Sequence, residues 1–191
     1  MKNFASLSLL FILLLSCTGQ EVSDQDYQIK TGVLAAPEHQ RAEATVLGYN
    51  RNGEMVMLRE GTNDFVCIAD NPTKEGFSVA AYHKSLEPFM TRGRELKAQG
   101  LNAKEVFDKR EKEVAAGTLE MPDKATLYVS TGDLNEETGE IDNFYTRYVI
   151  YIPYATEEST GMPLSPPAPG APWIMDPGTH RAHIMINPPK N

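Results

Sequence analysis

Apolar and polar positions alternate in the first third of the chain as they do in β-strands. Residues 45–49 and 55–58 are strand-like runs, and an Asn-Gly pair between them supplies the positive φ angles that a hairpin turn requires. A third run at 65–69 stops at a turn that contains the strand-breaking Pro72. We therefore expect these three strands to form an antiparallel meander.

Two amphipathic helices are predicted next, because apolar residues recur at helical spacing. The first holds Leu86, Phe89, Met90, Gly93 and Leu96, with Ser85 placed to cap its start and Gly100 to close its end. The second begins at Asn102, and Glu105 three residues later completes a capping box. Its charged residues 109–113 are expected to face solvent, and Gly117 ends the helix.

Strand character returns after the helices, at residues 125–130, 145–153 and 182–186. The run at 147–152 alternates less cleanly than a one-sided strand would, which predicts a central strand covered on both faces. Strands, then a helix pair, then strands again indicate the α+β class. The expected architecture is an antiparallel sheet with the pair of helices inserted between its N- and C-terminal strands.

The beginning of the chain has the three parts of an export signal. Lys2 is the charged start, residues 7–15 form an apolar run too short to span a bilayer, and small residues follow. The sequence Leu-Leu-Ser-Cys that ends at Cys17 resembles the bacterial lipobox, in which the cysteine thiol receives a diacylglyceryl group before cleavage. The resemblance implies that Cys17 carries a lipid that tethers the protein to a membrane. An ordinary export signal with an incidental cysteine is the alternative.

The lipobox also implies a location in the cell envelope. Thr18 follows the cysteine; since it is not Asp, the inner-membrane retention signal is absent, and by analogy the outer membrane facing the periplasm is favoured. Residues 18–30 are polar and cannot bury enough apolar surface to order themselves. The expected division is a signal peptide at 1–16, a flexible tether at 17–32 and a single α+β domain at 33–191.

The chain is acidic, with 26 Asp and Glu against 18 Lys and Arg and a formal net charge of -8. This balance argues against nucleic acid as a partner, and against an electrostatic grip on anionic lipid. An envelope protein or a small-molecule ligand remains as the partner beside the membrane. With Cys17 lipidated, Cys67 has no partner for an internal disulfide. Its apolar neighbours favour a buried thiol over a reactive nucleophile or a dimer link.

The side chains that are most suited to binding a ligand or a metal ion lie near the C-terminus. Trp173, Asp176, His180 and His183 occur within one short segment. A turn between the two histidines could bring both imidazoles onto one metal ion, with Asp176 as a further ligand, although the tetrahedral ligand set is incomplete by sequence. In the alternative reading, His183 packs beside the core while Asp176 and Thr179 brace the loop through local hydrogen bonds.

Three other segments carry features of a possible site. A proline-rich loop at 159–177 leads into the histidine segment and is expected to be extended. Arg59 and Asn63 belong to a polar cluster between two strands, which is either a hairpin turn or a ligand-binding loop facing the same pocket as the histidines. The acidic residues at 133–142 fail the EF-hand pattern and favour a solvated hairpin loop.

Templates for common catalytic chemistry are absent from the sequence. It contains no Gly-x-Ser-x-Gly elbow, phosphate loop, dinucleotide fingerprint or Cys-x-x-Cys pair. No cofactor is therefore assigned.

Two sequence blocks resemble an exported bacterial family of unassigned function. They are Leu58-Arg59-Glu60-Gly61-Thr62-Asn63 with the following Cys67 and Asp70-Asn71-Pro72, and the closing Arg181-Ala182-His183-Ile184-Met185-Ile186. The similarity spans about residues 42–188. Family members carry a second cysteine after the turn, where this chain has Ala80-Ala81, so the resemblance implies that Cys67 has lost a disulfide partner. The family brings no activity with it.

These observations favour a lipid-anchored binding or structural domain of the cell envelope, with the segment from Trp173 to His183 as its contact surface. The alternative is a metal-dependent periplasmic enzyme that uses His180, His183 and Asp176. A third hypothesis is a subunit of an envelope assembly with the helix pair as its interface.

Overall fold

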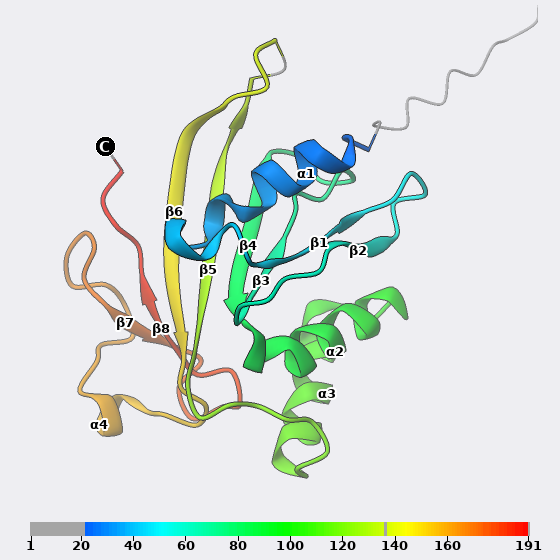
Figure 1. Ribbon diagram of the computed structural model, residues 1–191. Helices are drawn as coiled ribbons and strands as arrows, with labels where there is room; N and C mark the ends of the chain where they lie inside the picture. The colour runs from blue at the N-terminus through cyan, green and yellow to red at the C-terminus, as the bar shows by residue number, and fades with distance from the viewer. Residues whose placement is uncertain (1–21, 136, 191) are drawn as a thin grey trace, which may run out of the picture.

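A single eight-stranded sheet runs through the molecule in the order β2-β1-β3-β4-β5-β6-β8-β7 (Figure 1). The computed structural model describes residues 22–135 and 137–190. The strands are β1 (Thr45–Tyr49), β2 (Met55–Arg59), β3 (Phe65–Ile68), β4 (Phe77–His83), β5 (Ala125–Leu134), β6 (Ile141–Tyr151), β7 (Trp173–Met175) and β8 (His183–Ile186). The helices are α1 (Gln25–Gly32), α2 (Glu87–Ala98), α3 (Ala103–Ala115) and α4 (Glu157–Thr160), with short 3-10 turns η1 (Val33–Ala35), η2 (Glu38–Gln40) and η3 (Lys84–Leu86). The α+β class is confirmed.

The finer prediction for the sheet is only partly correct. All neighbouring strands are antiparallel except β1 and β3, which run parallel. The β1–β2 hairpin forms as expected, with Gly53 at a φ of 76°. The three-strand meander is wrong, because β3 lies on the opposite side of β1 from β2. The pair α2–α3 does fall between β4 and β5, but α1 precedes the first strand, so the topology is not a simple insertion.

The loop at 60–64 explains the parallel pair. It folds back across the start of β1, where the backbone N–H of Gly61 donates to Thr45 Oγ1 at 3.1 Å. A Cβ on Gly61 would lie 2.2 Å from the backbone nitrogen of Thr45, so this crossing requires glycine. The loop thereby delivers β3 to the free side of β1, where Val66 pairs with Thr45.

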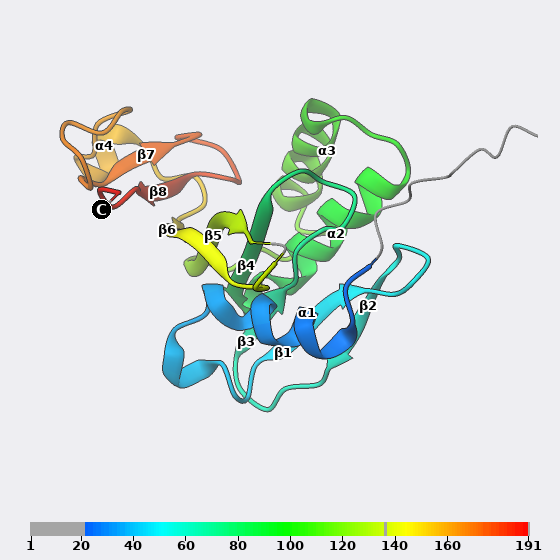
Figure 2. The ribbon, with the colours of Figure 1, turned by 90° about the horizontal axis from the view of Figure 1, so that it is seen from above.

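Helices cover both faces of the sheet at its β1-β3-β4 region (Figure 2). On one face α1 and η1 enclose a core built from Ala35, Ala36, Ala44, Val46, Cys67, Phe77, Val79 and Ala81. On the other face Leu86 of η3 and Phe89 of α2 form a core with the strand residues Val66, Tyr82, Ala125, Val149 and Tyr151. Cys67 is fully buried, and burial raises the pKa of its thiol to about 12, which confirms the expectation of a buried cysteine.

The prediction of a flexible tether is wrong for residues 25–32, which form α1. Asp24 caps the helix, and the buried Gln28 side chain accepts from the backbone N–H of Tyr49 at 2.8 Å and donates to its carbonyl at 3.0 Å. Through these two bonds the side chain of Gln28 pairs with the backbone of Tyr49, the last residue of β1, and fixes α1 to the sheet. Because α1 is polar in composition, apolar periodicity could not indicate it.

The helix pair follows its local signals at most points. Asn102 and Glu105 form the expected capping box, and Gly117 adopts a φ of 68° after α3. The start of α2 differs, because the turn η3 precedes α2: the His83 side chain, not Ser85, caps η3, and α2 itself has no side-chain capping bond. The solvent-facing prediction for residues 109–113 is wrong at Arg110, which is 8% exposed.

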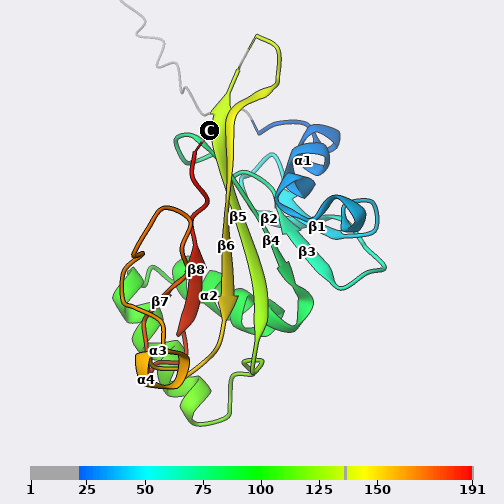
Figure 3. The same cartoon turned by 90° about the vertical axis from the view of Figure 1, so that its left-hand side faces the viewer.

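Strands β5 and β6 form a long hairpin that extends beyond the rest of the sheet (Figure 3). Its turn confirms the hairpin loop expected at 133–142. β6 does lie between two other strands, but it is not covered on both faces: Val149 and Tyr151 are buried while Tyr148 is 40% exposed. The proline-rich segment also contains α4 and the edge strand β7, which periodicity did not indicate.

Among the described helices, none is long and apolar enough to cross a bilayer. The predicted signal peptide and Cys17 lie outside the described residues.

Candidate functional site

The turn between β7 and β8 packs against α3. It carries His180, whose side chain is fully buried between two phenylalanine rings. Phe89 of α2 and Phe107 of α3 meet the imidazole edge to face, with ring centroids at 5.5 and 4.8 Å. The turn thus joins the C-terminal strands to the helix pair.

Glu111 of α3 ties this turn in place. Its Oε2 atom accepts the backbone N–H of His180 at 2.9 Å and lies 2.5 Å from His180 Nδ1. Burial raises the pKa of Glu111, but the hydrogen bonds from His180 outweigh it and leave the pKa below its usual value. Burial lowers the pKa of His180 despite the nearby carboxylate. At neutral pH a neutral imidazole therefore donates from Nδ1 to an ionised Glu111, while the buried Nε2 has no partner among the described residues.

The turn itself is braced by local hydrogen bonds, as the structural alternative anticipated. Asp176 Oδ2 accepts from Arg181 Nε at 2.7 Å, and Thr179 Oγ1 donates to the Asp176 carbonyl at 2.8 Å. Asp176 adopts a φ of 49°, which is costly for a residue with a side chain and is held here by these bonds. Arg181 also places its guanidinium 5.0 Å from the Phe107 ring centroid.

His183 begins β8 and is 8% exposed. Its Nδ1 lies 2.7 Å from the carbonyl oxygen of Arg181, so Nδ1 carries the proton and donates. Burial lowers the pKa of His183, and the Arg181 charge acts in the same direction, while the bond to that carbonyl opposes it. The ring packs 5.5 Å from that of Tyr151. His183 therefore packs beside the core, as the structural alternative expected.

A hollow of about 280 Å³ opens beside His183, on the same sheet face as α2 and α3. We call it the β6–β8 hollow; it is lined by Val129, Arg147, Val149, Met175, Arg181, His183 and Met185. Arg147 is half-buried and has neither a hydrogen bond nor an ion pair to any residue that the structure describes. The hollow thus combines apolar side chains with an uncompensated guanidinium.

The predicted contact segment is brought together only in part. Trp173 pairs with Met185 across the β7–β8 ladder, so it lies next to the β6–β8 hollow without lining it. His183 lines the hollow, whereas His180 is enclosed by aromatic rings. Within residues 22–135 and 137–190, no group of three or more His, Cys, Asp or Glu side chains is placed to hold a metal ion. The two histidines therefore do not form the proposed metal centre there.

The cluster at Arg59 and Asn63 does not face the histidines. Four strands separate β1 from β8, and no residue of the cluster lines the β6–β8 hollow. Arg59 donates to the carbonyls of Ala44 and Arg41, while Asn63 donates to Gln40. These bonds anchor the segment that enters β1, so the cluster has a structural role, and the prediction that it faces the same pocket as the histidines is wrong.

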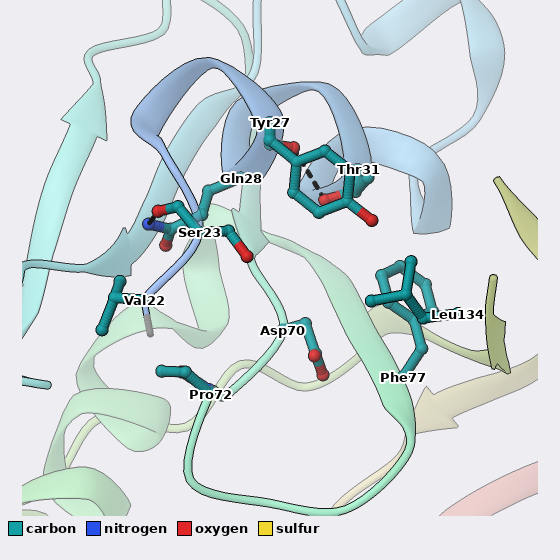
Figure 4. Close-up of a pocket in the computed structure, with 9 residues that line it drawn as sticks. All are labelled: Val22, Ser23, Tyr27, Gln28, Thr31, Asp70, Pro72, Phe77 and Leu134. Atoms are coloured by element: carbon teal, nitrogen blue, oxygen red, sulfur yellow. Dashed lines mark hydrogen bonds between the residues drawn. The ribbon is translucent and has the colours of Figure 1, made fainter. Parts of the chain in front are cut away.

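Two further hollows are less suited to a ligand. One, between α1 and the turn after β3, has room for about 60 Å³ and is lined by Val22, Ser23, Tyr27, Gln28, Thr31, Asp70, Pro72, Phe77 and Leu134 (Figure 4). Such a space accommodates little more than water. The other is a wide groove between β1–β2 and α2, in which Arg94 is already bonded to Glu87, Thr91 and Tyr82. The guanidinium of Arg94 is therefore satisfied by the protein, while Lys74 and Lys97 of this groove are exposed to solvent.

Sequence reasoning missed two residues of this region. Arg147 interrupts an otherwise apolar run in a strand, and that interruption was a usable signal of a special position. Glu111 stands in a run of alternating charges, where nothing local distinguishes it from its solvated neighbours. A comparison of the chain with known protein families, with curated proteins and with solved structures finds no match in any of them.

Proposed function

We propose that this protein is a binding domain of the bacterial cell envelope, held at a membrane by lipid on Cys17, with the β6–β8 hollow as its ligand site. The observation that carries the proposal is Arg147, a half-buried guanidinium without a protein partner beside apolar side chains. Small-molecule sites are concave and mostly apolar, with a few polar groups that orient the ligand. Because this guanidinium is partly exposed it costs the free protein little, and it is available to pair with an oppositely charged group of a ligand.

The rigid surroundings of the hollow support binding. Its floor is the paired β6–β8 ladder, and one rim is the turn held by Glu111, His180 and Asp176. Sites built on rigid elements lose less entropy when a ligand binds. The metal-dependent enzyme has no comparable support among the described side chains, because they hold no cluster of three or more such donors.

The membrane anchor is tested by labelling cells with an alkyne analogue of a fatty acid. The wild-type chain should incorporate the label, and the Cys17→Ser variant should not. Cys67→Ser is the matched control, because its buried thiol is not accessible to acylation in the folded protein. Equal labelling of wild type and Cys17→Ser would contradict the lipid anchor.

Binding at the hollow is tested by thermal unfolding in the presence of a panel of small metabolites. The panel contains neutral, cationic and anionic compounds. We expect at least one compound to raise the melting temperature of the wild type by several degrees, since binding to the native state alone stabilises it. Val129→Phe, which fills the hollow from β5, should abolish that shift. The site assignment is wrong if no compound raises the melting temperature of the wild type. It is also wrong if every active compound raises the melting temperatures of the wild type and of Val129→Phe equally.

A further inference from the structure

The β6–β8 hollow is basic although the chain is acidic. Arg147 lies near one end of it and Arg181 at the other, because Val149 pairs with Met185 and Tyr151 pairs with His183 along the ladder. The two arginines differ in whether their guanidinium groups are already bonded to another protein side chain. Arg181 is bonded through Nε to Asp176, whereas Arg147 has no partner in the described part of the chain.

A second cation reinforces the charge at the Arg147 end. Tyr145 precedes Arg147 by two residues on β6, so both side chains project from the same face of the strand. The ammonium of Lys190 lies 5.4 Å from the centroid of the Tyr145 ring. No carboxylate of the residues that the structure describes lines the hollow. This end of the site therefore favours a negatively charged group.

The middle of the hollow is apolar. Val129 lies beside Arg147 on the neighbouring strand, and Val149, Met175 and Met185 line the hollow from there toward Arg181. Methionine side chains are unbranched and polarisable, so they adapt to ligands of irregular shape. The four steps along the strand from Arg147 to Tyr151 span about 13 Å at roughly 3.3 Å per residue. That length accommodates an apolar body much larger than an inorganic anion requires.

We infer that the β6–β8 hollow takes a small amphipathic carboxylate, with its head group on the Arg147 guanidinium and its alkyl body over the valine and methionine side chains toward His183. This inference rests on the proposed binding function and adds the ligand class. A guanidinium presents its N–H donors as a planar fork that matches the two oxygens of a carboxylate. The carboxylate pairs with that charge, while the alkyl chain gains from leaving water.

The probes are octanoate, octanol and acetate, which separate the contributions of charge and chain. They are titrated into the full chain carrying Cys17→Ala, so that no attached acyl group competes. Calorimetry measures affinity, and the fluorescence of Trp173, the single tryptophan, reports binding next to β8. We expect octanoate to bind at least tenfold more tightly than either octanol or acetate.

Variants of the head-group residue complete the test. Arg147→Met should weaken octanoate at least tenfold and leave octanol unchanged, while Arg147→Lys should give an intermediate affinity because it keeps the charge without the fork. Arg51→Met, in the β1–β2 turn, is the matched control and should bind like the wild type.

Two results would overturn the inference. Equal affinities for octanol and octanoate, with no effect of Arg147→Met, would show that charge does not select the ligand; the proposed binding function would then stand if Val129→Phe still blocked both probes. No binding of octanoate by the wild type would also overturn it, and only the wider panel of metabolites would then decide whether the hollow binds anything.

Discussion

At the β2-β1-β3 end of the sheet, polar side chains are bonded to the protein, whereas near the β6-β8-β7 end several buried polar atoms have no partner. Arg59 alone donates to the carbonyls of Arg41 and Ala44. Of the five buried side-chain atoms without a hydrogen bond in the described residues, four belong to Arg110, Trp173, His180 and Asn187.

This difference separates polar side chains that stabilise the fold from polar side chains whose hydrogen-bonding groups remain available to a ligand. Buried polar groups are nearly always hydrogen-bonded, so a concentration of exceptions in one region needs a reason. Two residues near that region, Tyr154 and Asp176, also adopt positive φ angles of 62° and 49°. Unpaired donors and strained backbone gather at ligand sites more than elsewhere. The bonded side chains at one end of the sheet therefore stabilise the fold, while the other end holds these exceptions and the hollow in which we propose a ligand site.

The largest loss of stability is expected from a substitution at the β2-β1-β3 end of the sheet, where the polar side chains are hydrogen-bonded to the protein. Arg59→Met removes the charged donor of the bonds to Ala44 and Arg41 and leaves their carbonyls unpaired, which should lower the free energy of unfolding by about 3 kcal/mol. Urea denaturation measures the change. Arg51→Met, in the β1–β2 turn, should stay within about 0.5 kcal/mol of the wild type. Similar losses for both variants would mean that Arg59 has no anchoring role.

A smaller loss is expected at the link between α3 and the C-terminal turn. Glu111→Gln replaces the charged acceptor of both N–H groups of His180 with a neutral one, which should cost about 2 kcal/mol. The exposed Glu120 provides the control, and Glu120→Gln should leave urea denaturation unchanged. A stability of Glu111→Gln equal to that of the wild type would show that the turn is held by its own hydrogen bonds alone.

Acid should destabilise the same region. Burial holds the pKa values of His180 and His183 below the usual 6.5, so the unfolded chain takes up protons that the folded chain does not. Stability is therefore complete above pH 6.5 and falls below it, by at most about 1.4 kcal/mol per pH unit for each histidine. Urea denaturation from pH 7 to 5.5 should show this slope, and His183→Gln should reduce it. The exposed His39 is the control; if His39→Gln flattened the profile equally, the buried histidines would not be its cause.

The smallest effect on stability is expected at Arg147. Because this side chain has no partner within residues 22–135 and 137–190, Arg147→Met should change the free energy of unfolding by less than about 0.5 kcal/mol. Chemical denaturation in the absence of ligand measures it. This result would sharpen the contrast with Arg59, since two arginines on one sheet would differ by several-fold in their contribution to stability. A loss as large as that of Arg59→Met would instead make Arg147 a structural residue.

Local sequence signals correctly predicted those turns and helix ends that are stabilised by residues close to them in the sequence. The β1–β2 turn, the capping box at Asn102 and the glycine that follows α3 all depend on contacts within a few residues. The same reasoning failed for α1, whose decisive bonds run from Gln28 to Tyr49. It also failed for the position of β3, which depends on how closely Gly61 passes Thr45.

The candidate site shows the same division. The sequence predicted a contact surface at Trp173 to His183, and the structure places Met175, Arg181 and His183 in the β6–β8 hollow. Glu111 reaches His180 across 69 residues of chain, so no spacing could associate them.

By itself the sequence determined the α+β class, the positions of the main helices and most strands, and the buried state of Cys67, because periodicity, caps and apolar neighbours act locally. Only the tertiary structure decided that β3 runs parallel to β1, that His180 and His183 join no group of three or more metal-ligating side chains among the described residues, and that Arg59 is bonded to backbone carbonyls there while Arg147 has no partner. Those facts depend on which distant segments supply carbonyls and carboxylates, and such partners become defined only when the sheet and the helix pair assemble.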